Sequence, residues 1–177
     1  DDMDLWDYLN WMDKIICEIQ AQLRENGSFI IHANPKSVHY LKVLCDDIFG
    51  IDNFMNEIVW SWDYGARSKN YWPRKHDNLL WYVMNPDKYT FNLDECDKIE
   101  YMSPKLVGEE KASKGKTPTD SWWVSIEGTN SKRRFGYATE KPYDLLERIM
   151  SPTFNHSFFF KIIGVVIRNT KKIETYI

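Results

Sequence analysis

Short apolar segments alternate with longer amphipathic segments along the first 85 residues, and this alternation limits the possible folds more than any other feature. Between residues 5 and 23, apolar side chains recur every three or four positions, which predicts a helix that Asn26-Gly27 ends. Residues 28–33 are short, mostly apolar and partly β-branched, as expected for a strand buried on both faces of a parallel sheet. Ser37 is suited to cap a second helix, which Gly50 closes.

Two further strands are predicted at residues 58–62 and 78–83, where apolar and β-branched or aromatic side chains dominate. A polar, basic stretch of about fifteen residues separates them. The resulting order of helix, strand, helix and strand is typical of an α/β sheet.

The pattern loosens between Pro86 and Arg134, where Gly, Pro, Lys, Ser and Thr are frequent and residues 109–116 are of low complexity. We interpret this segment as an inserted, partly flexible region. Residues 141–150 predict another helix, with Pro142 in its first turn and Pro152 ending it. Residues 158–167 are strongly apolar and predict a buried strand.

Composition excludes several classes of protein. A hydrophobic content of 43% with 15% aromatic residues argues against disorder, and a net charge of −3 gives no global attraction to a polyanion. The three cysteines are widely spaced, which argues against a disulfide framework and favours the cytoplasm. No apolar run reaches the roughly 18 residues that predict a membrane span. The chain begins at Asp1 within an acidic, helix-like phrase, from which we expect a fragment.

A basic and aromatic stretch at residues 64–76 is the first candidate for chemistry. Its cations are interleaved with aromatic rings, the combination that a nucleic-acid backbone and an unstacked base require. An equally good interpretation is a solvated loop whose rings tuck under the edge of the sheet. The side chains concerned are Arg67, Lys69, Arg74, Lys75 and His76, with Tyr64, Tyr71 and Trp72.

Other polar clusters carry weaker signals. Lys132-Arg133-Arg134 could contact phosphates, as could three lysines within residues 111–116, although a solvated surface is the favoured interpretation for those lysines because Glu109 and Glu110 adjoin them. In Asp120-Ser121-Trp122-Trp123, burial of both tryptophans in a core is favoured. The four histidines are scattered, so no metal site is predicted.

Taken together and in order, several phrases resemble the DNA N6-adenine and N4-cytosine methyltransferases of the β arrangement, including type III restriction-modification (Mod-like) subunits. The likeness runs from Trp6 to Ile149. The phrases are Tyr8-Leu9-Asn10-Trp11-Met12, Gly27-Ser28-Phe29-Ile30-Ile31-His32, His39-Tyr40-Leu41-Lys42, Asp47-Ile48-Phe49-Gly50, Phe54-Met55-Asn56-Glu57-Ile58-Val59-Trp60, Pro73-Arg74-Lys75-His76-Asp77-Asn78-Leu79-Leu80-Trp81-Tyr82, Gly136-Tyr137-Ala138-Thr139-Glu140-Lys141-Pro142 and Leu145-Leu146-Glu147-Arg148-Ile149.

This resemblance implies part of a Rossmann-like, S-adenosylmethionine-dependent methyltransferase sheet, which acts on a base flipped out of double-stranded DNA. In that family an Asp-Pro-Pro-Tyr type tetrapeptide polarises the target amine, and an Asp-Pro-Phe-x-Gly-x-Gly turn cradles the cofactor. Neither motif occurs in this sequence, so no catalytic residue is assigned and the chain alone is expected to be inactive. A gene fragment, a frameshift or a decayed copy would explain both the abrupt start and the missing glycine-rich turn.

The resemblance also implies roles by position. Thr139, Lys141 and Pro142 are expected beside the cofactor. Trp72 is expected to offer a stacking surface, and Arg74, Lys75 and His76 to contact phosphates. Residues 1–85 and 136–177 are expected to form the methyltransferase core, with residues 86–135 inserted as the target-recognition region.

The possible partners follow from the same resemblance. Beyond DNA, a second copy of the chain or a restriction or specificity subunit is expected. The alternative function is a noncatalytic DNA-binding or regulatory subunit, or a remnant that binds neither DNA nor cofactor. The target base and the recognition sequence are not readable from these residues.

Overall fold

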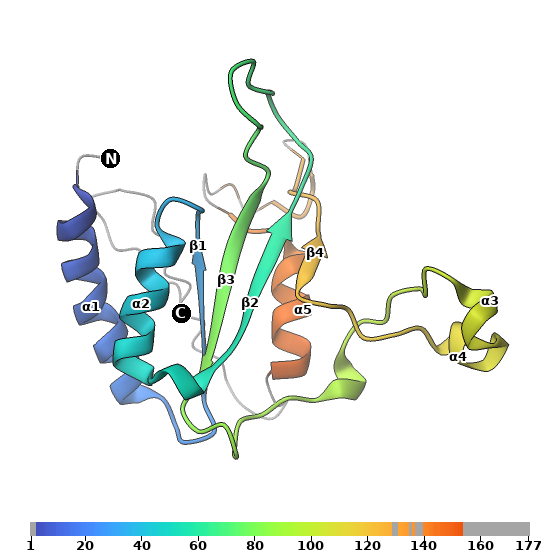
Figure 1. Cartoon of the computed structure of the whole chain (residues 1–177), viewed down its shortest axis with the longest axis horizontal. Coiled ribbons are helices and arrows are strands. Elements are labelled where there is room, and N and C mark those ends of the chain that lie inside the picture. Colours follow the sequence, from blue (N-terminus) through green and yellow to red (C-terminus); the bar gives the residue numbers. More distant parts are fainter. Residues whose placement is uncertain (1–2, 129–130, 135, 137–139, 154–177) are drawn as a thin grey trace.

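A computed structural model describes residues 3–128, 131–134, 136 and 140–153. In these residues a four-stranded sheet, in the order β1-β3-β2-β4, has helices on both faces (Figure 1). The α/β class expected from the sequence is therefore confirmed. The strands are β1 (Ser28–Ala33), β2 (Phe54–Ser61), β3 (His76–Val83) and β4 (Ser121–Trp123).

The pairing of β1 corrects the expectation of a parallel sheet. β3 runs antiparallel to both β1 and β2, and only the short β4 pairs in parallel with β2. Side chains of β1 alternate between buried and half-buried, so this strand is not fully covered on both faces. A continuous apolar run does not report strand direction, because direction depends on which distant segment supplies the partner.

Two helices cover one face of the sheet, α1 (Leu5–Gln22) and α2 (Val38–Phe49). The carboxylate of Asp4 caps α1 by accepting from the backbone N–H groups of Trp6 and Asp7. Ser37 precedes α2 as predicted, but its side chain makes no capping bond. The core on this face consists of Met12, Ile16, Phe29, Ile31, Ala33, Val38, Leu41, Cys45, Phe49, Leu80 and Tyr82.

A polar contact anchors α2 to the sheet within this core. The hydroxyl of Tyr82 donates to the Asp46 carboxylate at 2.7 Å, and the Lys42 ammonium donates to the same group at 2.6 Å. Burial, together with this hydrogen bond, raises the pKa of Tyr82 well above its ordinary value. Gly50 ends α2 with a φ of 90°, the left-handed region that favours glycine, as the sequence predicted. The 3₁₀ turn η1 (Ile51–Asn53) then leads into β2.

Helix α5 (Tyr143–Thr153) covers the opposite face. It begins two residues later than predicted, and the carbonyl of the buried Pro142 accepts from the N–H groups of Leu145 and Leu146. Pro152 does not end the helix but lies in its last turn, where a missing N–H costs a single backbone bond. The core on this face consists of Ile58, Trp60, Leu79, Trp122, Val124 and Leu145.

The segment from residue 86 to 128 holds more structure than its composition suggested. It contains η2 (Leu93–Glu95), α3 (Pro104–Val107), α4 (Glu109–Lys114) and β4. In Figure 1 the two short helices lie away from the sheet, whereas β4 returns to its edge. The low-complexity run thus contains α4. The strand predicted at residues 158–167 lies outside the described residues.

Candidate nucleic-acid interface

The connection between β2 and β3, residues 62–75, projects beyond the end of the sheet (Figure 1). We call it the β2–β3 loop. Tyr64 and Tyr71 are exposed, and the side chain of Trp72 is 93% exposed. The rings therefore do not tuck under the edge of the sheet, which was the alternative interpretation of this stretch.

Two cations of the β2–β3 loop contact other residues of the same loop. The Lys75 ammonium donates to the backbone carbonyls of Tyr64 and Ala66. The Arg74 guanidinium lies 5.6 Å from the centroid of the Tyr71 ring. Such cation–π and hydrogen-bond contacts restrict a loop without hiding its charge from solvent.

Two other residues of the predicted DNA-binding set lie in the same loop. Arg67 forms a bidentate pair with Asp63 at 2.5 and 2.7 Å, and both side chains stay largely exposed. Lys69 is exposed as well. Arg67 therefore carries a local counter-charge that its basic neighbours lack, and an exposed pair of this kind contributes little to stability. His76, predicted to contact phosphate, begins β3 and is exposed.

The second basic cluster is surrounded by carboxylates. Arg133 lies 2.7 Å from Asp144 and 3.7 Å from Glu127, and the hydrogen bond that its guanidinium donates to the Asp144 carboxylate raises the pKa of Arg133 further. Arg134 lies 4.0 Å from Glu140. Lys132 is exposed. Much of the charge that the sequence suggested for phosphate contacts is thus balanced by acidic side chains that flank this cluster in the sequence.

Lys141 lies at the same end of the sheet as the β2–β3 loop. Its ammonium is 5.6 Å from the centroid of the Trp60 ring, one residue before β2 ends and the loop begins. The Trp60 ring in turn lies 4.7 Å from the ring of Trp62, the first loop residue. Lys141, expected beside the cofactor, therefore lies near the start of the loop that contains most of the predicted DNA-binding residues. Pro142 is buried, and Thr139 lies outside the described residues.

Between these two features lies a polar pair that the sequence analysis missed. His32 Nε2 and Asp77 Oδ2 are 2.9 Å apart, and both side chains are mostly buried. The His32 ring lies 5.9 Å from the Trp60 ring. Strand register explains why these side chains meet. Asp77 of β3 is opposite Trp60 of β2, and Leu79 of β3 is opposite His32 of β1. Because Asp77 and Leu79 are two residues apart, they and their partners lie on the same face of the sheet, the face that α5 covers. No sequence spacing signals a pair formed between residues 45 positions apart.

The His32–Asp77 pair leads to a testable pH dependence. Burial lowers the pKa of His32, assisted by the Lys141 charge and opposed by the Asp77 hydrogen bond. Below about pH 6.5 the unfolded chain therefore takes up a proton before the folded chain does, so stability is expected to fall as the pH drops toward the lowered pKa. We expect the free energy of unfolding, measured across this pH range, to depend less steeply on pH in His32→Gln than in the wild-type protein.

The exposed His39 on α2 supplies the matched control for this measurement. His39→Gln should keep the pH slope of the wild-type protein, because it leaves the His32–Asp77 pair intact. Equal slopes in the two variants would contradict the assignment to His32.

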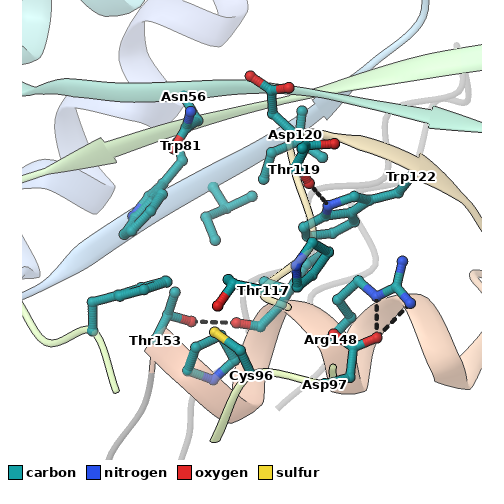
Figure 2. Close-up of a pocket in the computed structure, with 16 residues that line it drawn as sticks. Asn56, Trp81, Cys96, Asp97, Thr117, Thr119, Asp120, Trp122, Arg148 and Thr153 are labelled. Atoms are coloured by element: carbon teal, nitrogen blue, oxygen red, sulfur yellow. Dashed lines mark hydrogen bonds and ion pairs between the residues drawn. The ribbon is translucent and has the colours of Figure 1, made fainter. Parts of the chain in front are cut away.

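A cavity of about 420 Å³ lies elsewhere, between the sheet and the C-terminal half of α5 (Figure 2). Its wall includes Trp81, Trp122 and the ion pair between Arg148 and Asp97, whose closest N–O distance is 2.5 Å. No residue of the predicted cofactor or DNA set lines this cavity. We therefore do not place the candidate interface there.

The two adjacent tryptophans of β4 have different environments. Trp122 is buried and donates to the carbonyl of Thr119 at 2.6 Å, as expected for a core residue. Trp123 is 67% exposed, so the expectation that both are buried is wrong for this residue. The reason is that successive side chains of a strand point to opposite faces.

Comparison with known proteins places this arrangement in a family. A mixed α/β sheet that carries a basic, aromatic loop and a lysine at one end fits part of a methyltransferase fold. A family model described as DNA methylase matches residues 2–156. The chain therefore belongs to the DNA methylase family of N6 and N4 methyltransferases, as its phrases indicated.

Curated relatives that are named as methyltransferases match most of this chain. The type II methyltransferase M.HpaI of Haemophilus parainfluenzae is 26% identical over 156 residues, which cover 88% of this chain and 48% of M.HpaI. The DNA adenine methyltransferase YhdJ of Escherichia coli is 27% identical, with coverages of 84% and 52%. M.BglII of Bacillus subtilis is 27% identical, with coverages of 84% and 45%. The chain thus spans about half the length of these relatives.

Within the described residues, no helix combines the length and apolar character needed to cross a membrane. The same residues contain no group of three or more His, Cys, Asp and Glu side chains arranged to hold a metal ion.

Proposed function

We propose that this chain is part of a site-specific DNA amino-methyltransferase, which transfers a methyl group from S-adenosylmethionine to the exocyclic amine of adenine or cytosine. The observation that carries the proposal is the common location of the β2–β3 loop and Lys141, with Trp60 between them. Base and methyl donor must meet at one place for the transfer, and proximity of this kind contributes much of a catalysed rate.

The charge of the residues near this end of the sheet is complementary to part of the cofactor. S-adenosylmethionine supplies an electrophilic methyl group and carries a carboxylate. The Lys141 ammonium is a cation able to attract that carboxylate, and its contact with the Trp60 ring holds it at this end of the sheet. His32 is held by Asp77 beside the same ring, and its lowered pKa favours a neutral imidazole there near neutral pH.

The chain alone is proposed to lack methyl transfer. Its sequence contains neither an Asp-Pro-Pro-Tyr tetrapeptide to polarise the amine nor the glycine-rich turn to cradle the cofactor. Preorganised groups at the reacting amine are usually the largest contribution to such a rate, and no other described residue is assigned that role. A second copy, or a restriction or specificity subunit, is the partner that we would test for supplying them.

Residues 86–135 are proposed as the target-recognition region. The short helices α3 and α4 lie away from the sheet, so contacts that they make with DNA would not disturb either core (Figure 1). Lysines 105, 111 and 114 give this region cations for phosphate contacts.

Titration of the purified chain tests the proposed function. We expect it to bind labelled duplex DNA with an affinity that falls as salt rises, by a logarithmic slope of about −0.9 for each phosphate neutralised. Absence of binding at low salt would overturn the proposal. Labelled S-adenosylmethionine should also bind; DNA binding without cofactor binding would favour the alternative of a noncatalytic DNA-binding subunit. Methyl transfer by the chain alone, near the rate of an intact enzyme, would contradict its proposed inactivity.

A further inference from the structure

Trp72 is the most exposed aromatic residue in the described part of the chain. Its ring is 93% exposed on a loop that projects past the sheet, whereas Trp60, Trp81 and Trp122 are buried in the body of the protein. A single exposed apolar residue is common on protein surfaces and needs no explanation. The neighbours of Trp72 are what give its exposure meaning.

The first relevant property of these neighbours is stiffness. Lys75 crosses the loop to the carbonyls of Tyr64 and Ala66, and Arg74 packs on the ring of Tyr71 beside Trp72. The loop is therefore held by its own contacts on both sides of the exposed ring. A ring presented by a braced loop loses little conformational entropy when it binds.

The second property is charge. Lys69 and Arg74 lie within three residues of Trp72 on either side and are exposed, and no acidic residue occurs between Tyr64 and His76. A flat apolar ring between cations is complementary to the stacked bases and flanking phosphates of a nucleic acid. An acidic or apolar protein surface would match only one of these two features.

We propose that Trp72 acts as a wedge, inserting between neighbouring bases of duplex DNA and unstacking that step. The inference rests on the proposed function and adds a role that loop cations cannot supply. Apolar side chains that enter a base step kink and unwind the duplex, and the energy of unstacking is offset by the added contacts. An unstacked step lowers the cost of moving one of its bases out of the helix.

The experiment compares Trp72→Ala, Trp72→Phe and a control, Trp6→Ala, which removes another exposed tryptophan (68%) from the distant helix α1. Two readouts are used: the fluorescence of 2-aminopurine in a duplex, which rises when the base is unstacked, and the change in linking number when bound circular DNA is relaxed. Wild type and Trp6→Ala should give the full signal in both. Trp72→Phe should keep most of it because a flat ring remains.

Trp72→Ala should lose both signals and bind duplex DNA about tenfold more weakly, the effect of removing one base–aromatic stack. Unchanged signals in this variant would overturn the wedge, while salt-dependent binding would leave the proposed function standing. If wild-type protein bound no DNA, the wedge and the proposed function would fall together. Because Trp72 is 93% exposed, its variants should keep the melting temperature of the wild-type protein, which shows that they are folded.

Discussion

Replacing Lys69 and Arg74 together with glutamate is expected to weaken duplex binding about 10- to 100-fold near 0.1 M salt, with the slope of log affinity against log salt reduced by about two. Both side chains are exposed on the β2–β3 loop, and within the described part of the chain neither forms an ion pair with an acidic residue. The change therefore removes two phosphate contacts and adds two repulsive charges.

A control makes the same change of charge at a site outside the loop. Lys14 is exposed on α1, away from the β2–β3 loop, so Lys14→Glu is compared with Lys69→Glu as single substitutions. Lys69→Glu should weaken binding several-fold and Lys14→Glu should have little effect, since screening confines surface electrostatics to about 10 Å at this salt. Equal effects would show that binding depends on net charge, and the loop would no longer be the assigned interface.

Replacing Leu41 with alanine is expected to lower the free energy of unfolding by about 2–5 kcal/mol, through lost apolar burial and the cavity left behind. Leu41 is fully buried, in the core between α2 and the sheet. A loss of this size is a large share of the stability of an ordinary domain. Chemical denaturation followed by circular dichroism measures it.

Val43 on the same helix provides the matched control, because its side chain is 69% exposed. Val43→Ala should change the free energy of unfolding by less than about 0.5 kcal/mol. If both variants lost equal stability, α2 would not pack on the sheet through the face that contains Leu41. In that case α2 would not support the sheet whose strands β2 and β3 hold the candidate interface.

The elements that the sequence predicted well are those whose signals are local. The three-to-four spacing from Leu5 onward, the apolar phrase at Phe29 and the glycine at position 50 each report the conformation of their own neighbourhood. The basic loop was located for the same reason, since it lies between two recognisable strands. Ordered phrases along the chain were also enough to indicate the family that comparison confirms.

β4 could not be predicted in this way. It has three residues and lies within a polar segment, so neither its length nor its composition distinguishes it from a turn. Its place depends on β2, which supplies the carbonyl of Ser61 to the Val124 N–H and the N–H of Val59 to the Asp120 carbonyl. The alternation that leaves Trp123 exposed follows only once this pairing exists.

The sequence by itself determined the main helices and the strands β1, β2 and β3, where the exposed cations and rings gather, and to which family the chain belongs. The tertiary structure alone decided the place of β4, the antiparallel direction of β3 and the meeting of His32 with Asp77. The physical reason is range: helix periodicity and turn chemistry act over a few residues. Strand register and ion pairing join residues far apart in the chain, and they are set by how whole elements pack.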